Sequence, residues 1–186
     1  MPTRRCIIVL AALAAFGTAH AQEPKWRASA GALYGQDWLG SEDTRRGGYY
    51  ALSRSWPEPR IHFWGYRGEL DIEGYYMFTK GGSDFIAGPN SSHHYGVLVI
   101  GRYYQRYTRA TRAFVEAGWG LQFTNRLTHD IDTRVNSTPM VGVGLISPLS
   151  DEEVMFSLRY FHISNAGTAG GNEGLNFFQL SVGLRF

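Results

Sequence analysis

A histidine and a serine two residues apart near the end of the chain have the types and spacing of a hydrolytic pair. His162 and Ser164 lie in the segment HISNAG, which Asn165, Ala166 and Gly167 complete. Side chains two residues apart on a β-strand point to the same face with Cβ atoms roughly 6.6 Å apart, so the imidazole can lean onto the hydroxyl. We expect His162 to act as the base for a Ser164 nucleophile. The residues after the serine offer an oxyanion hole through one side-chain amide and two backbone N–H groups.

Two alternating stretches flank this segment and place it on a sheet. Every even position of 154–160 and of 178–186 is apolar, whereas the odd positions are mixed and include charged residues. This period of two is that of a strand with one apolar face. His162 and Ser164 continue the even row, so parity directs them to the apolar, lipid-facing side.

The chain holds eight candidate strands of this kind, an even number. Several reach the roughly 9–11 residues that a membrane-crossing strand needs, and short turns such as PEPR at 57–60 alternate with longer polar loops. That arrangement is typical of an outer-membrane barrel, so we predict an all-β fold, an eight-stranded antiparallel transmembrane β-barrel. The expected strands are Trp26–Trp38, Arg46–Trp56, 69–78, Ser92–Arg106, 114–123, Asn136–Pro148, 154–161 and 178–186.

A soluble β-sandwich or lipocalin-like barrel would show the same alternation. Such a fold would turn the aromatic and aliphatic face inward and leave the charged face outside. Charges of both signs instead suit the polar lumen of a small membrane barrel, which side chains just fill. The residues that share the charged face are Glu69, Asp71, Glu73, Arg102, Glu116, Arg159 and Arg185.

The start of the chain has the pattern of a secretory signal peptide. Arg4 and Arg5 precede an apolar run and a small-residue cleavage pattern, so we expect a signal peptide at 1–21 and the barrel at 22–186. Without these two arginines, the 18 Lys and Arg residues fall to 16, which balance 16 Asp and Glu residues. This balance argues against nucleic acid as a partner. The only cysteine, Cys6, also lies in the signal, which excludes thiol chemistry from the mature chain.

The even row of the last strand begins at Asn176. If the two final strands pair with Val154 near Leu184, His162 falls opposite Asn176, and a register one step away brings Ser164 there instead. Polar side chains at membrane depth are costly and tend to mark function; the alternative is a set of rim residues solvated by lipid headgroups. With both termini on the periplasmic side, this rim is the extracellular one.

Two segments resemble the active-site strand pair of the lipid A 3-O-deacylase (PagL) family, HISNAG at 162–167 and GGNEGLN at 170–176, and AFVEAGWG at 113–120 is similar to the family as well. The resemblance implies an eight-stranded outer-membrane barrel with a Ser-His-acid hydrolase site on its lipid-facing wall. It makes Ser164 the nucleophile and His162 the base. The implied oxyanion hole comprises Asn165, Ala166 and Gly167, and Asn172 shapes the substrate loop.

The family pattern has a glutamate where this chain has Asn176. The nearest carboxylate, Glu173, lies three residues earlier with the opposite parity. An amide can hold an imidazole by a hydrogen bond, but it does not stabilise imidazolium as a carboxylate does. Three alternatives stay open: Asn176 orients His162, Glu173 swings in, or the protein is a weak enzyme.

These features predict a serine esterase of the bacterial cell outer membrane that removes the 3-O-linked acyl chain from lipid A of lipopolysaccharide, without metal or other cofactor. His129, Asp130 and Asp132, close together in one loop, are interpreted as solvated polar residues. One alternative is an acyltransferase or phospholipase barrel, which needs an apolar lumen for its acyl chain. Another is a non-catalytic structural or adhesive barrel. The sequence leaves open the acyl-chain preference, the regulation and whether two barrels form a homodimer.

Overall fold

The computed structural model describes residues 25–63, 66–81, 91–106, 111–170 and 173–186. The predicted signal peptide at 1–21 and the predicted substrate-loop residue Asn172 lie outside these ranges. Within them, no helix is long and apolar enough to cross a membrane.

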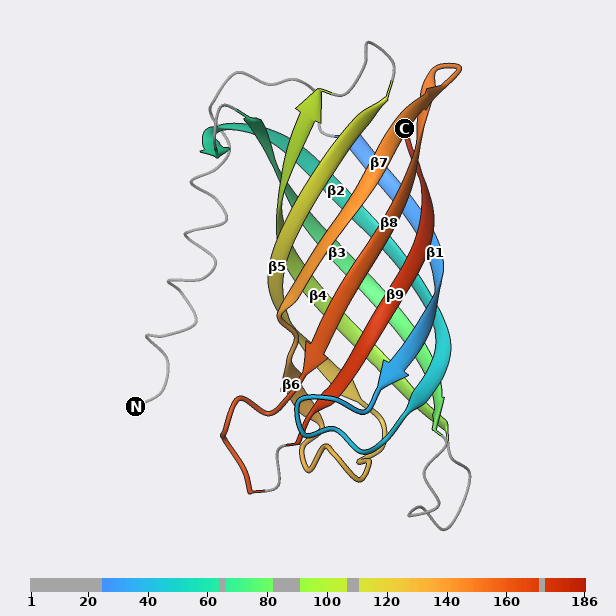
Figure 1. Cartoon of the computed structure of the whole chain (residues 1–186), viewed down its shortest axis with the longest axis vertical. Helices are drawn as coiled ribbons and strands as arrows, with labels where there is room; N and C mark the ends of the chain where they lie inside the picture. Colours follow the sequence, from blue (N-terminus) through green and yellow to red (C-terminus); the bar gives the residue numbers. More distant parts are fainter. Residues whose placement is uncertain (1–24, 64–65, 82–90, 107–110, 171–172) are drawn as a thin grey trace, which may run out of the picture.

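All strands of the described chain pair antiparallel in one sheet, which closes into a barrel (Figure 1). Closure comes from β1 and β9, which pair from Arg27 opposite Arg185 to Gln36 opposite Asn176. The strands are β1 (Lys25–Gln36), β2 (Arg45–Phe63), β3 (Tyr66–Gly81), β4 (Ser91–Arg106), β5 (Arg112–Thr124), β6 (Val135–Ser137), β7 (Met140–Leu149), β8 (Glu152–Ile163) and β9 (Leu175–Arg185).

The short β6 and the longer β7 act as a single strand of the barrel wall. Both pair with β5 in one register, so nothing is inserted between them. The interruption falls at Thr138 and Pro139, where the proline has no N–H to donate to the ladder. The predicted eight-stranded antiparallel barrel is therefore confirmed, with the expected strand Asn136–Pro148 divided in two.

The turn predicted at 57–60 is wrong, because β2 continues through these residues to Phe63. The pairing of β2 with β3 shifts register between Glu58 and His62. Proline is tolerated in strands at such irregularities, so the two prolines of PEPR coincide with a distortion of the ladder and not with the end of the strand.

The two faces of the barrel wall have opposite chemistry. Leu158 on β8 and Leu180 on β9 lie opposite each other and are exposed on the outer face. Arg159 and Gln179, the next pair along the same strands, are buried in the lumen. The apolar face is thus outside, and the alternative of a soluble barrel with an apolar interior is wrong.

Ion pairs fill one part of the lumen. Arg102 contacts Glu116 at 2.7 Å and Asp71 at 2.8 Å. Arg159 contacts Glu73 and the same Glu116, each at 2.6 Å. All of these side chains are buried, so the predicted lining of paired charges is confirmed.

A layer of apolar side chains fills the lumen beside the ion pairs. Phe161 and Ile163 of β8 and Leu175 and Phe177 of β9 belong to it, and each is fully buried. These residues alternate with His162 and Asn176 along the two strands. The inner surface behind the candidate site is therefore packed hydrophobic core.

Candidate active site

The pairing of β8 with β9 brings His162 opposite Asn176. Of the two registers left open by the sequence, the one with Val154 opposite Leu184 is observed. His162 Nδ1 lies 2.8 Å from Asn176 Oδ1, within hydrogen-bonding distance. Asn176 is buried and His162 half-buried, so the contact is partly shielded from its surroundings.

Two further contacts fix the orientation of the Asn176 amide. Its Nδ2 donates a hydrogen bond to the backbone oxygen of Trp38 at 2.7 Å, and its Oδ1 accepts one from the Tyr160 hydroxyl at 2.5 Å. The atom facing His162 is therefore an acceptor, which requires the imidazole proton to be on Nδ1. Nε2 then carries the lone pair that a general base needs.

A glycine makes room for the other side of the imidazole ring. Gly174 comes directly before β9, and a Cβ placed on it would lie 2.7 Å from His162 Cε1 and 3.3 Å from Nε2. Its φ of +77° is also one that residues with side chains rarely adopt. Because the pairing ends with Ile163 opposite Leu175, Gly174 is next in line opposite Ser164. The ring thus extends from Asn176 toward the serine's end of the strand.

Ser164 continues β8 beyond its last paired residue. Its backbone N–H donates to the Ser137 oxygen at 3.1 Å, and its own oxygen accepts from the Ser137 N–H at 2.8 Å. This bridge keeps Ser164 in the same row as His162. The side chain is not open to lipid as parity alone predicted, however, because Ser164 is only 7% exposed. The Ser164 and His162 side chains share no hydrogen bond in the described chain; such bonds are often long before substrate binds.

The three predicted oxyanion donors differ in their present partners. The Gly167 N–H donates to Asn165 Oδ1 at 2.8 Å, and Asn165 Nδ2 donates to the Ala169 oxygen at 3.3 Å. Within the described residues, the Ala166 N–H has no such bond. Ala166 and Gly167 both have positive φ values, 55° and 75°, so the backbone turns sharply directly after Ser164 and Asn165.

The structure separates the two candidates for the third catalytic group. Asn176 contacts His162, whereas Glu173 is half-exposed and lies with its Oε2 3.9 Å from His129 Nε2. Glu173 therefore does not orient His162 in this conformation.

A model of the lipid A 3-O-deacylase (PagL) family matches residues 24–185. The chain belongs to this family. Among solved structures, the outer-membrane enzyme PagL is 20% identical with a TM-score of 0.58, and the match covers 86% of this chain and 97% of that one. Neisserial surface protein A is 16% identical with a TM-score of 0.60, covering 87% and 95%. No curated protein matches the chain.

Membership of the PagL family places the protein in the bacterial outer membrane. The similarity to PagL and to Neisserial surface protein A, at 20% and 16% identity, concerns the fold alone.

Three aromatic side chains frame the site on the outer wall of the PagL-family barrel. Trp38 packs on Tyr160 with ring centroids 5.6 Å apart and on Phe178 at 5.4 Å. Trp38 and Gly174 were not predicted from the sequence as site residues. The glycine-rich segment GGNEGLN could have indicated a close approach at Gly174, but no sequence pattern indicated that the loop carrying Trp38 folds back onto Asn176.

Proposed function

We propose that the protein is an outer-membrane serine esterase that hydrolyses the 3-O-linked acyl ester of lipid A. The observation that carries the proposal is the contact of His162 with Asn176 on the outward row of β8 and β9. This contact leaves Nε2 on the side of the ring that lies toward Ser164. The chain's membership of the lipid A 3-O-deacylase family supports the same function.

The reaction begins when Ser164 Oγ attacks the ester carbonyl and its proton passes to His162 Nε2. The tetrahedral intermediate collapses, the bond to the sugar oxygen breaks, and that oxygen takes the proton from Nε2. A water molecule then attacks the acyl-enzyme, with Nε2 again accepting the proton and returning it to Ser164 Oγ. The products are a free fatty acid and lipid A with a free 3-hydroxyl group.

Backbone N–H groups after Ser164 stabilise the oxyanion. Ala166 is the first donor, because its N–H has no partner within the described residues. Gly167 joins it when its N–H exchanges Asn165 Oδ1 for the substrate oxygen, a change confined to one turn. Each such donor contributes roughly 3–4 kcal/mol to catalysis.

An amide at position 176 is compatible with this mechanism. In serine proteases, replacing the triad aspartate by asparagine lowers turnover about 10⁴-fold because the histidine adopts the wrong tautomer. Here the Trp38 oxygen holds Nδ2, so Asn176 presents Oδ1 and selects the productive tautomer. What is missing is the negative charge opposite imidazolium, so we expect a slower enzyme than one with a carboxylate.

The outward position of the site suits a substrate that stays in the bilayer. The acyl ester of lipid A lies near the boundary between headgroup and chain, at the height of a rim site. Trp38, Tyr160 and Phe178 offer an aromatic surface to the acyl chain. The lumen, by contrast, is filled by ion pairs and apolar side chains, which disfavours a mechanism that holds the acyl chain inside.

The test is the mass spectrum of lipid A from cells that produce the protein. Wild type is expected to remove one ester-linked hydroxyacyl chain, and Ser164→Ala to remove none. Ser29→Ala, a serine on β1 far along the barrel from the site, is the matched control and should behave as wild type. Unchanged lipid A with the wild-type barrel folded in the outer membrane contradicts the proposal and favours a non-catalytic barrel.

A further inference from the structure

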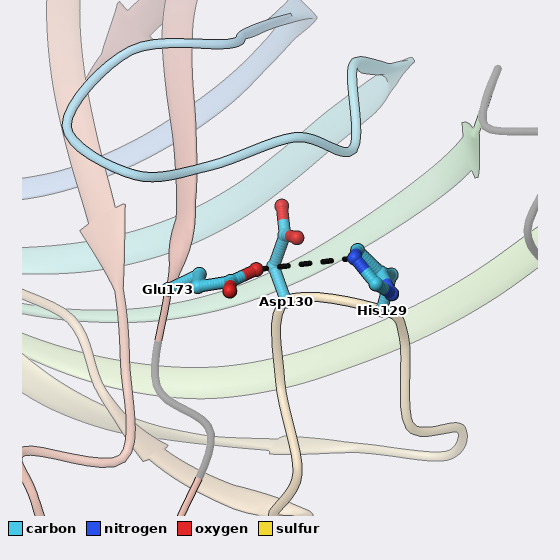
Figure 2. Close-up of side chains that lie close together, drawn as sticks. All are labelled: His129, Asp130 and Glu173. Carbon is cyan, nitrogen blue, oxygen red and sulfur yellow. Dashed lines mark ion pairs between the residues drawn. The ribbon is translucent and has the colours of Figure 1, made fainter.

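Three outer loops bring four potential metal ligands together beside the candidate active site. His129 and Asp130 from the β5–β6 loop and Glu173 from the β8–β9 loop each offer a ligand atom, and these atoms lie within 4.8 Å of one another (Figure 2). Glu42 from the β1–β2 loop adds its Oε2 at 3.3 Å from His129 Nε2.

Asp130 is the unusual member of this cluster, and its interpretation from the sequence as a solvated residue is wrong. It is 1% exposed, and its Oδ2 accepts hydrogen bonds from Ser41 Oγ at 2.8 Å and from the backbone N–H groups of Glu42 and Asp43 at 3.0 and 2.8 Å. Its Oδ1 is buried without a hydrogen-bond partner. All these donors are neutral, and within the described residues no Lys, Arg or His nitrogen pairs with this carboxylate.

A buried carboxylate without a cation is costly, and the surrounding charges increase that cost. Glu42 and Glu173 add two more carboxylates, while His129 contributes at most one positive charge. Ion pairing within the cluster therefore leaves an excess of negative charge. A divalent cation would compensate this charge and give Asp130 Oδ1 a partner.

We propose that His129, Asp130 and Glu173, with Glu42, bind a divalent cation. One imidazole nitrogen with carboxylate oxygens suits Zn²⁺ or a similar transition metal better than Mg²⁺ or Ca²⁺, which prefer oxygen alone. Ligand atoms on tetrahedral Zn²⁺ lie about 3.3–3.6 Å apart, given bonds of about 2.0–2.2 Å. The distances from His129 Nε2, 3.3 Å to Glu42 and 3.9 Å to Glu173, come close to this range.

The cation would tie these loops to the strand that carries Asn176. The backbone N–H of Gly174 donates to the backbone oxygen of Asp130 at 2.9 Å, and Gly174 packs against the ring of His162. A cation held by Asp130 and Glu173 thus fixes the position of Gly174, which packs against the imidazole of His162. The site is structural and its occupancy does not depend on the proposed ester chemistry.

The experiment is calorimetric titration of Zn²⁺ into the full-length mature barrel, untagged, chelator-treated and folded in detergent micelles. Wild type is expected to bind one equivalent. Asp130→Asn and Glu173→Gln should each weaken binding at least about tenfold, as loss of a ligand does. Asp132→Asn, an exposed aspartate of the same loop, makes the same change in charge and should bind as wild type does.

Glu173→Gln keeps the test valid if Asp130→Asn fails to fold, because Glu173 is half-exposed. Wild type that binds no Zn²⁺, or binding that Glu173→Gln leaves unchanged, overturns the proposal. Ser164→Ala should bind Zn²⁺ like wild type. Failure of the lipid A assay therefore contradicts only the proposed function, and failure of the Zn²⁺ titration contradicts only the cation site.

Discussion

The lumen and the outer wall of this barrel both carry polar side chains, but the polar side chains of the two regions differ in how they are paired. In the lumen, Arg159 contacts both Glu73 and Glu116, so these three charged side chains are paired with one another. On the outer wall, His162 has one ring nitrogen bound to Asn176, and Nε2 has no hydrogen-bond partner within the described residues. The paired charges give this part of the lumen a structural role, whereas the free Nε2 of His162 is what the proposed chemistry on the outer wall requires.

The two regions also differ in charge. The lumen uses full charges because each is enclosed by opposite ones, at 2.6 Å between Arg27 and Glu73 for example. The outer site uses the neutral amide of Asn176 beside the imidazole, and a hydroxyl and a backbone oxygen hold that amide in place. A neutral partner avoids the cost of an ionised carboxylate next to lipid, and it gives up part of the stabilisation of imidazolium.

The largest expected effect tests the outer site. Ser164→Ala should lower deacylation of lipid A by purified protein by about 10³-fold or more, the scale on which triad serines act. Fatty acid release in detergent micelles measures it. The urea midpoint of unfolding should stay within error of wild type, since the serine side chain makes no hydrogen bond within the described residues. A variant that releases fatty acid at the wild-type rate contradicts the assigned nucleophile.

The second largest expected effect is a loss of stability when the ion pairs of the lumen are broken. Glu116→Ala leaves Arg102 and Arg159 each without one carboxylate, and breaking a buried pair costs about 3–5 kcal/mol. Urea unfolding followed by gel mobility should show this loss, with deacylation per folded molecule nearly unchanged. Glu152→Gln, on an exposed position of β8, is the control. Loss of activity in a stable Glu116→Ala barrel contradicts the division of roles.

Asn176→Ala removes the group that orients the imidazole and should reduce deacylation about 10²-fold, the range of a misplaced general base. Asn176→Asp should be at least as active as wild type, because it adds the missing charge. Glu173→Gln is the comparison that decides between the two candidates for the third group. Steady-state rates of chelator-treated protein, in which any effect through the proposed cation is absent, should place it within about twofold of wild type; a larger loss under these conditions assigns the role to Glu173.

The smallest effect concerns Tyr160, a positioning residue. Tyr160→Phe deletes one hydrogen bond to Asn176 Oδ1, a loss of about 0.5–1.5 kcal/mol, or roughly two- to tenfold in rate. The loss should appear in kcat and hardly in KM, because the ring that contacts the acyl chain is kept. Equal changes in both constants, or a rise in KM alone, would assign Tyr160 to substrate binding instead.

Period-two alternation, with the lengths of turns and loops, was sufficient to predict the barrel and its outward face, and it placed His162 and Ser164 in the same row as Asn176. Which of the two lies opposite Asn176 was left open, and the structure shows that it is His162. Parity depends only on strand geometry, which is why that inference holds along the full length of the paired strands. Contacts made by loops have no such period. The Trp38 oxygen on Asn176 and the approach of Glu173 to His129 depend on how loops distant in sequence fold together.

The strand pairing also has irregularities that the alternation of apolar and polar residues does not predict. Pro139 interrupts the strand between β6 and β7, and the prolines of PEPR lie within β2. In both cases tertiary pairing outweighs the local preference of proline for turns. The covered position of Ser164 follows from its backbone bridge to Ser137 at the rim.

The most direct test of the central claim is to treat the folded barrel in micelles with a lipid-soluble fluorophosphonate and locate the adduct by peptide mass spectrometry. An activated serine on the outer wall predicts a single adduct on Ser164, which is absent in Ser164→Ala and at least tenfold slower to form in Asn176→Ala. An unmodified Ser164 in the folded wild-type barrel, or a reaction rate that Asn176→Ala leaves unchanged, would contradict the account.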